Sequence, residues 1–432
     1  MKGVVFLFIH TVKPGDSVYA IAKAYGIPVQ KIIDDNYLDN PERLIVGQNL
    51  IISGDSMRHT VASGQSLYSI ARKYGTTVEQ ILKANPSIAN PARISAGQII
   101  NIPLKTAKLG TIEVNGYAFA NIEAQVLNST LPHLTYLSIF SYQVRPDGTL
   151  APINDAHLIE AARQARVAPM MVISNIEEGA SFSSELAHTI LTDEKVQNSL
   201  IDNVIKILNE KNYFGLDIDF EYIFRTDREN YNAFLRKIGS RLRALGYILT
   251  TAVAPKTSSA QRGLLYEAHD YVAHGQLVDH IIIMTYEWGY TYGPAQAVAP
   301  ANQVAKVLSY AVSVIPSQKI LMGMPNYGYD WTLPFAEGSA AKTLSNSGAL
   351  ELAYRVRANI QYDVPSQSPY FYYYDQDKKR HAVWFDDARS IKARLELVDR
   401  YNLGGVSYWT INRFYPQNWI VLESMYNVKK LL

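Results

Sequence analysis

The most informative stretch of this 432-residue chain reads Phe214-Gly215-Leu216-Asp217-Ile218-Asp219-Phe220-Glu221-Tyr222. Acidic and apolar residues alternate along it, which indicates a β-strand with two different faces. The acids share one face, and the apolar residues between them share the other. In a barrel of parallel strands the apolar face packs on the surrounding helices, so the carboxyls point into the barrel. Glu221 then lies at the C-terminal end of the strand, where barrel enzymes place their active sites.

Further segments on both sides of this stretch also read as strands, and most are separated by helical stretches such as Tyr231–Leu245. With Gly215–Glu221 the candidate strands are Gly116–Phe119, Tyr136–Phe140, Ala168–Ser174, Ile248–Ala254, His280–Tyr286, Ile320–Pro325 and Gly405–Trp409. This alternation predicts an α/β fold, a (β/α)8 TIM barrel over residues 110–432. The gap between the last two strands is too long for one helix. We therefore expect a small α+β insertion at about 333–386, between strands seven and eight.

The acidic strand has three possible explanations. Solvated acids on an edge strand are disfavoured by the apolar neighbours. A divalent metal would need several oxygen ligands from loops, and no second acidic cluster is present. The remaining hypothesis is acid/base catalysis on a glycosidic bond, with neighbouring carboxyls raising the pKa of the proton donor. No phosphate-binding loop, dinucleotide fingerprint or serine elbow occurs, so we expect no metal and no cofactor.

The acidic strand resembles the Asp-x-x-Asp-x-Asp-x-Glu signature of glycoside hydrolase family 18, the chitinase-like barrels. In that family the 2-acetamido oxygen of the substrate is the nucleophile, and the configuration of the sugar is retained. The resemblance implies that Glu221 is the general acid and base, that Asp219 orients the acetamido group, and that Asp217 tunes Asp219. The chain departs from the signature at Phe214, where the first Asp would stand. This departure puts the pH optimum in doubt.

Other segments fit the same family by position. Met284-Thr285-Tyr286-Glu287 is similar to its Met-Thr-Tyr-Asp segment, which implies that Tyr286 hydrogen-bonds the acetamido carbonyl and that Glu287 replaces an Asp. Trp409, at the end of the last strand, is expected to form the apolar floor under the reacting sugar. The remaining candidate substrate-binding residues follow predicted strands or lie on the same rim: Trp288, Asn326, Tyr327 and Trp331.

The N-terminal part contains an internal repeat. The pattern His10-Thr11-Val12-x-x-Gly15-x-Ser17 returns as His59-Thr60-Val61-x-x-Gly64-x-Ser66, and the two copies stay in step to Ile52 and Ile102. Each copy predicts a βααβ unit, with Ser17 and Ser66 as helix N-caps. We expect one unit at residues 1–53 and the other at 57–104.

Both copies resemble the LysM module over nearly their full length. The resemblance implies binding of glycans that contain N-acetylglucosamine, in a groove between the loop before the first helix and the loop after the second. The alternative is that the residues of these loops only form turns. The candidate glycan-binding residues are Gly15, Asp16, Ser17 and Asn40 in the first copy and Gly64, Gln65, Ser66 and Asn90 in the second.

Composition narrows the functional class. The formal net charge is +2, the chain has no cysteine, and 30 Tyr stand beside 13 Phe, an excess that suits wet surfaces such as sugar sites. A nucleic-acid partner, a disulfide framework and a membrane span are not expected. The apolar run Val4–Ile9 is too short for a signal peptide and is interpreted as the start of a strand. His269 and His274 fit no metal spacing and are expected at the surface.

Two LysM modules before a family 18 barrel resemble the spore-associated cortical-fragment-lytic N-acetylglucosaminidases. The segments Met284–Tyr290, Tyr327–Pro334 and Val383–Ser390 carry this narrower resemblance. It implies hydrolysis of the N-acetylglucosamine linkage in spore-cortex peptidoglycan during germination, by a monomer in the coat or cortex of the spore, made without a cleavable signal peptide. The alternatives are a chitinase acting on chitin oligomers and a non-catalytic cell-wall-binding protein. Glu221 argues against the last, because inactive family members typically lose this residue.

Overall fold

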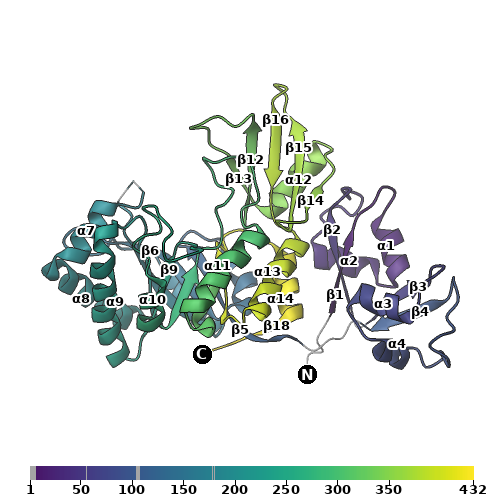
Figure 1. Ribbon diagram of the computed structural model, residues 1–432, viewed down its shortest axis with the longest axis horizontal. Helices are drawn as coiled ribbons and strands as arrows, with labels where there is room; N and C mark the ends of the chain where they lie inside the picture. Colours follow the sequence, from purple (N-terminus) through teal and green to yellow (C-terminus); the bar gives the residue numbers. More distant parts are fainter. Residues whose placement is uncertain (1–5, 55, 104–107, 178, 180) are drawn as a thin grey trace.

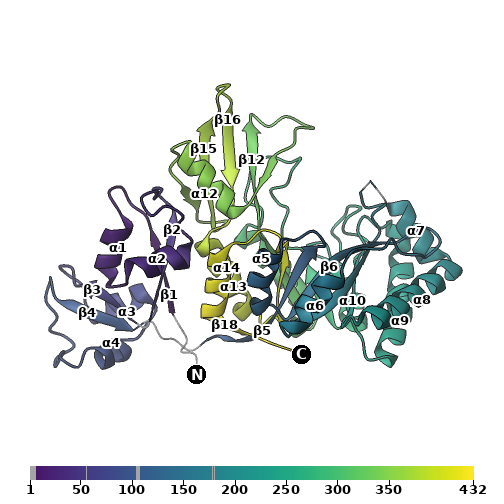
Figure 2. The same cartoon turned by 180° about the vertical axis from the view of Figure 1, so that it is seen from behind.

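The computed structural model describes residues 6–54, 56–103, 108–177, 179 and 181–432. Figure 1 shows a central barrel with a small sheet domain above it and two small modules, coloured purple to blue, at one side. Turning the molecule by 180° shows the same separation of the modules from the far helices of the barrel (Figure 2). Residues 1–5 and Leu104, at the ends of the two predicted modules, lie outside the described residues.

The barrel closes, because its last strand pairs in parallel with its first. The predicted (β/α)8 barrel is therefore confirmed. Its strands are β5 (Gly110–Phe119), β6 (Tyr136–Gln143), β7 (Ala168–Ser174), β8 (Gly215–Asp219), β9 (Ile248–Val253), β10 (His280–Ile283), β11 (Ile320–Pro325) and β17 (Gly405–Trp409). A short strand, β18 (Tyr426–Val428), pairs with the beginning of β5, which is why β5 begins earlier than predicted.

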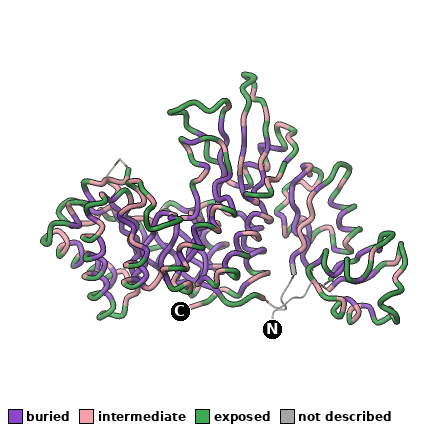
Figure 3. Tube along the Cα trace, in the orientation of Figure 1, coloured by how far each residue is buried: buried purple, intermediate pink, exposed green. Residues whose placement is uncertain are grey.

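Helices surround the barrel and cover the apolar faces of its strands. They are α5 (Ala124–Thr130), α6 (Ala156–Gln164), α7 (Ser184–Thr192), α8 (Glu194–Lys211), α9 (Arg228–Ala244), α10 (Tyr271–Leu277), α11 (Ala301–Val314), α13 (Ala388–Arg400) and α14 (Pro416–Met425). The burial map in Figure 3 shows the strands almost wholly buried and the outer helix faces exposed. Leu216, Ile218 and Phe220 are fully buried in the main core, as the alternation predicts.

The insertion follows β11 directly and begins at Gly328, five residues before the predicted start. It contains β12 (Gly328–Leu333), β13 (Lys342–Leu344), α12 (Asn346–Arg355), β14 (Gln361–Asp363), β15 (Ser368–Tyr374) and β16 (Arg380–Trp384). The strands form an antiparallel sheet in the order β13-β12-β16-β15-β14. Because β12 follows the C-terminal end of β11, the insertion lies at that end of the strand, and Figure 1 shows it above the barrel.

Each repeat forms the predicted βααβ unit. The first module consists of β1 (Phe6–Thr11), α1 (Val18–Tyr25), α2 (Val29–Asn36) and β2 (Asn49–Gly54), and the second of β3 (Ser56–Thr60), α3 (Leu67–Tyr74), α4 (Val78–Ala84) and β4 (Ile99–Pro103). The two strands of each unit pair antiparallel. The apolar residues of both modules form one continuous core, so the second module is held by the first.

Candidate active site

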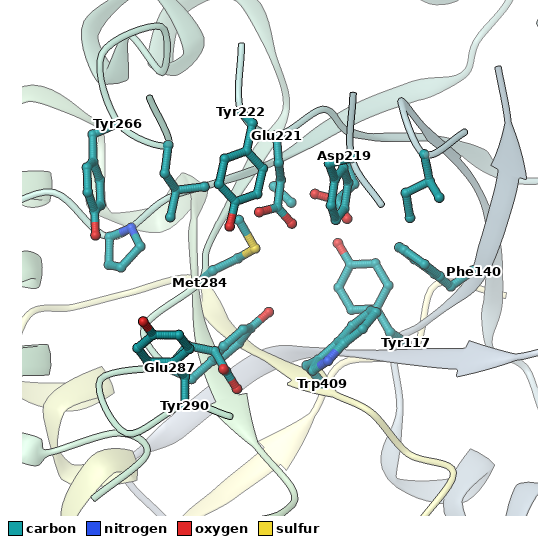
Figure 4. A pocket seen from close by; sticks show the side chains of 16 residues that line it. Tyr117, Phe140, Asp219, Glu221, Tyr222, Tyr266, Met284, Glu287, Tyr290 and Trp409 are labelled. Atoms are coloured by element: carbon teal, nitrogen blue, oxygen red, sulfur yellow. The ribbon is translucent and has the colours of Figure 1, made fainter. Parts of the chain in front are cut away.

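A cleft of about 550 Å³ opens at the C-terminal ends of the barrel strands, as Figure 4 shows from close by. Asp219 and Glu221 lie on one wall, and Glu287 and Trp409 lie on the other. Tyr286 also lines the cleft. The structure thus brings together five residues that the sequence placed on three different strands.

Asp217 lies beneath the cleft and is fully buried. Its carboxyl accepts hydrogen bonds from the Tyr117 hydroxyl at 2.6 Å and from the Thr250 hydroxyl at 2.5 Å. Burial raises the pKa of Asp217 to about 6, although both hydrogen bonds work in the opposite direction. Asp217 therefore changes its protonation state near pH 6. Its carboxyl is not exposed to bulk water.

Asp219 lies between Asp217 and Glu221 and is 5% exposed. Its Oδ1 is buried from solvent and has no hydrogen-bond partner among the described residues, so one acceptor atom of this cleft-lining residue is unsatisfied. Burial, and then the charges of Glu221 and Asp217, hold the pKa of Asp219 well above its ordinary value. The raised pKa values along the row favour a proton shared among the three acids.

Glu221 stands two residues beyond the end of β8, not within the strand as predicted. Asn175, directly after β7, fixes its backbone from both sides: the Asn175 side chain accepts from the Glu221 amide at 2.9 Å and donates to the Glu221 carbonyl at 2.8 Å. Burial, followed by the charge of Glu287, raises the pKa of Glu221 to about 7. Glu221 is half-buried in the cleft and is protonated below about pH 7, as a proton donor must be.

His269 and His274 are buried, so the prediction that they lie at the surface is wrong. His269 Nδ1 accepts from the Ala254 amide at 2.9 Å, which leaves Nε2 as the donor to the Phe220 carbonyl at 2.9 Å. Burial lowers the pKa of His269 to about 4, so the ring is neutral. It joins the ends of β8 and β9 immediately beside Glu221.

Glu287 is held by two tyrosines of the following segments. The Tyr327 hydroxyl donates to its Oε1, and the Tyr329 hydroxyl donates to the same oxygen at 3.0 Å. Burial raises the pKa of Glu287, and both hydrogen bonds oppose that rise. Tyr327, predicted to bind substrate, therefore reaches the cleft through Glu287.

Trp409 forms part of an aromatic floor. Its ring lies edge-on to Phe140, with centroids 4.9 Å apart, and to Tyr117 at 5.5 Å. It is half-buried, so one part of the ring remains available in the cleft. A sugar face can stack on such a surface.

The other candidates do not form part of this floor. Trp288 is half-buried and lines an adjoining cavity beside Tyr286. Asn326 is 6% exposed, and its side-chain amide is used to hold the Thr410 and Arg413 carbonyls. Trp331 is 3% exposed within β12, donates to the Tyr290 carbonyl at 3.3 Å and lines none of the cavities described here. The expectation that Trp331 forms a platform at the rim is not met, because the insertion begins before it and covers it.

Phe214, the departure from the family signature, lies at the opposite end of β8 from Glu221. It packs beside Tyr136, Met170 and Ile248 near the bottom of the barrel. The aromatic ring of Phe214 therefore fills core space at the bottom of the barrel, away from the acids of the cleft.

The candidate glycan-binding residues of the two modules all have a role in forming turns or helix caps. Ser17 and Ser66 are N-caps, and Asp16 accepts from the Lys13 amide at 2.8 Å. Gln65 accepts from the Ala62 amide at 2.8 Å. Asn40 and Asn90 each accept from the amide two residues on, and Gly15 and Gly64 have positive φ angles of 85° and 79°. Each thus shapes a turn or a cap.

Several cleft residues were missed by the sequence analysis. Tyr117, Tyr222, Tyr266 and Tyr290 line the cleft, and Asn175 and Thr250 position the acids. An asparagine directly after a buried strand was the one available signal for Asn175, since polar residues at strand ends of a barrel face its catalytic end. Within the described residues no group of three His, Asp or Glu side chains could hold a metal ion, and no helix is long and apolar enough to cross a membrane.

Comparison with known proteins agrees with this geometry. The chain is 42% identical over 430 residues to the cortical fragment-lytic enzyme of Bacillus anthracis (98% of this chain and 99% of the relative) and 42% identical over 426 residues to that of Bacillus subtilis (98% and 99%). The crystal structure of the Bacillus megaterium spore cortex-lytic enzyme SleL matches with a TM-score of 0.89 at 39% identity, covering 100% of both chains.

Comparison of the chain with protein-family profiles identifies the families of its domains. The LysM domain profile matches residues 10–53 and 59–103, and the profile of glycosyl hydrolases family 18 matches residues 100–413. A carbohydrate is therefore the substrate. With its closed barrel and its buried row of acids, the chain is a glycoside hydrolase that belongs to family 18 and carries two LysM domains.

Proposed function

We propose that the chain hydrolyses the N-acetylglucosamine linkage of spore-cortex peptidoglycan fragments during germination. The observation that carries the proposal is the row Asp217, Asp219 and Glu221, which lies buried beneath and within a cleft floored by Trp409. The relatives named as cortical fragment-lytic enzymes, which match over nearly their whole length, support the choice of substrate.

In the proposed mechanism Glu221 protonates the glycosidic oxygen while the 2-acetamido oxygen of the substrate attacks the anomeric carbon. In this mechanism Oδ1 of Asp219, which has no partner among the described residues, orients the acetamido group, and the raised pKa of Asp219 favours a shared proton. Tyr286 donates to the acetamido oxygen, and Trp409 supports the sugar. Glu221 then deprotonates the water that opens the intermediate, so the product retains its configuration.

The raised pKa of Glu221 sets the expected pH dependence. Hydrolysis requires the protonated carboxyl, so kcat/KM falls as the pH rises through about 7. Glu221→Gln cannot donate this proton and is expected to lower turnover by about 10²–10⁴-fold while leaving glycan binding intact. Hydrolysis by this variant at the wild-type rate would refute the assignment of the acid.

The substrate is tested by digesting purified cortex fragments beside chitin oligomers, with mass spectrometry of the new reducing ends. New N-acetylglucosamine ends from cortex, with little release from chitin, support the proposal. The reverse result would indicate a chitinase, and no cleavage of either would indicate a binding protein. The anomer released first, followed by NMR, tests retention.

We also propose that both modules bind the glycan strand, through the loops that contain the candidate residues of each copy, and that the protein acts as a monomer in the coat or cortex of the spore. The proposed domain limits are 1–53, 57–104 and 110–432. Binding of each module to N-acetylglucosamine oligomers, followed by NMR, tests the first proposal, and sedimentation tests the second.

A further inference from the structure

A second cavity, of about 430 Å³, adjoins the active-site cleft. Glu287 and Trp409 line both cavities, whereas Asp219 and Glu221 line only the cleft. We call this second cavity the side pocket. A glycan whose reacting sugar rests on Trp409 therefore brings the substituents of a neighbouring sugar within reach of the side pocket.

One wall of the side pocket is the loop that follows β17, residues 410–413, and this loop is fixed at several points. The Asn326 side chain donates to the Thr410 carbonyl at 3.1 Å and to the Arg413 carbonyl. Asn412 Oδ1 accepts from the Phe119 amide at 3.0 Å. The backbone that carries Arg413 is thus held in one position without a ligand.

The Arg413 side chain is exposed, and its hydrogen-bond partner is a backbone carbonyl and not an acid. Its Nη1 donates to the Leu344 carbonyl of β13 at 3.2 Å. No carboxylate among the described residues forms a salt bridge with it, whereas Arg228 pairs with Asp270 at 2.6 Å and Arg225 pairs with Glu267 at 3.6 Å in a different cavity. A guanidinium has five N–H donors, so most of those on Arg413 remain available.

Glu287 is the acid that shares the side pocket with Arg413, and it is already engaged. Both of its oxygens accept from tyrosine hydroxyls, those of Tyr327 and Tyr329. No salt bridge joins Glu287 to Arg413 among the described residues, and the partners of its carboxyl are these two hydroxyls. Polar side chains make up much of the remaining lining, among them Asn121, Thr343 and Asn412. An exposed guanidinium that has free N–H donors and no salt bridge among the described residues matches a carboxylate, which it can bind with two parallel hydrogen bonds.

We propose that the side pocket binds a carboxylate carried by the glycan, through Arg413, and thereby selects acidic over neutral N-acetylglucosamine glycans. The inference rests on the proposed function, because peptidoglycan carries carboxylates on its lactyl ethers or on attached amino acids and chitin carries none. Arg413 acts here as a specificity-determining residue and takes no part in bond cleavage.

The test compares Arg413→Gln with the wild type on four tetrasaccharides. These are a peptidoglycan fragment with free lactyl carboxylates, the same fragment with a single amino acid on each lactyl group, the same fragment with lactyl methylamides, and neutral chitotetraose. Arg236→Gln, an identical substitution of an exposed residue on α9, is the matched control. Because glutamine is shorter than arginine, the link to the Leu344 carbonyl is lost in the variant, and its thermal unfolding is therefore measured beside that of the wild type.

Arg413→Gln is expected to raise KM about tenfold for a carboxylate substrate, the effect of losing one charge-assisted hydrogen bond, with kcat nearly unchanged. The fragment that shows this rise identifies the lactyl or the amino-acid carboxylate as the ligand. KM for the methylamide is expected to be the same in both enzymes. An equal change on all four substrates, or none on any, would overturn the inference while leaving the proposed function standing.

Two further measurements keep the test decisive. If Arg413→Gln unfolds at a lower temperature than the wild type, Arg413→Lys replaces it, and a retained preference for carboxylates supports the charge. Salt should raise the wild-type KM for the carboxylate fragment and not for its methylamide, because salt screens an exposed ion pair. A wild type that cleaves chitotetraose and no peptidoglycan fragment would overturn the proposed function and this inference together.

Discussion

The two modules share a sequence pattern and a fold, yet they occupy different surroundings. The strand β2 of the first module is almost wholly buried against the barrel, whereas the corresponding strand β4 of the second alternates between exposed and buried residues. Asn49 at the start of β2 is 3% exposed, and Ile99 at the same place in β4 is 62% exposed. A repeat therefore specifies its own fold, and a few non-repeated residues specify what it docks against.

The contacts of the first module are specific and polar. Gln417 of α14 donates to Asn36 Oδ1 at 2.8 Å and to the Asn49 carbonyl at 3.1 Å. The Asn49 amide donates to Asp387, the N-cap of α13. Asn36 also makes the bonds within its module that Asn85 makes in the second, so docking uses an acceptor that the repeat already presents.

The largest expected difference between the modules is at a glycine pair. Gly47 and Gly97 have similar φ angles, 89° and 83°, but a Cβ at Gly47 would lie 1.9 Å from the Ile360 carbonyl oxygen, whereas one at Gly97 meets nothing within 4 Å. Gly97→Ala should cost only backbone strain, about 1–2 kcal/mol. Gly47→Ala should cost about 3 kcal/mol or more and undock the first module. Calorimetry with hydrogen exchange of α13 and α14 measures both, and equal costs would contradict the docked arrangement.

The next largest effect on stability is expected when Asn49 of β2 and Ile99 of β4 are each replaced by the other residue type. Asn49→Ile removes one buried donor to Asp387, which keeps its bonds from Arg389, and should destabilise the protein by about 2 kcal/mol. Ile99→Asn changes an exposed side chain and should stay within about 0.5 kcal/mol. Chemical denaturation of the two variants gives the comparison. A cost for Ile99→Asn as large as that for Asn49→Ile would mean that the second module also has a docked face.

A double-mutant cycle isolates one docking hydrogen bond. Asn36→Ala and Gln417→Ala should couple by about 1 kcal/mol, because each removes one partner of the same bond. Asn85→Ala is the control, since it breaks the equivalent bonds within the second module and should show no coupling to Gln417→Ala. Coupling of similar size in both cycles would indicate a general loss of stability instead of a specific contact.

The smallest effect concerns the histidine of each repeat. His10 hydrogen-bonds Asp16 at 2.9 Å, whereas His59 hydrogen-bonds Gln65 at 2.8 Å. Burial lowers the pKa of His59, and the charge of Lys73 adds to that lowering. Gln65→Glu would place a negative charge beside the ring and should raise the pKa of His59 by roughly 0.5, which corresponds to less than about 1 kcal/mol. NMR titration measures it, and no rise would mean that the new carboxylate turns away from the ring.

Much of the fold could be predicted because local patterns decided it. The strands Ala168–Ser174, Ile320–Pro325 and Gly405–Trp409 have the predicted bounds, since each is a short apolar run buried on both faces. β8 and β10 end earlier than predicted, because the residues that follow turn into the cleft. Glu287 has a φ of 68°, which ends any strand continuation there.

The candidate site was predictable where residues share one strand. The positions of Asp217 and Asp219 follow from period two along β8. Asn175 and His269, which hold the ends of the neighbouring strands beside Glu221, come from segments far apart in the chain. The burial of Trp331 depends on where the insertion begins. No local pattern carries this information.

The sequence by itself determined the barrel, the two repeated modules and the row of acids, because alternation and repetition act over neighbouring residues. Tertiary structure alone decided which module is docked, where Glu221 is held and why its pKa is about 7, and that Arg413 faces a pocket without a carboxylate partner among the described residues. Burial and electrostatics depend on groups that folding brings together from distant segments. Local sequence patterns therefore cannot predict them.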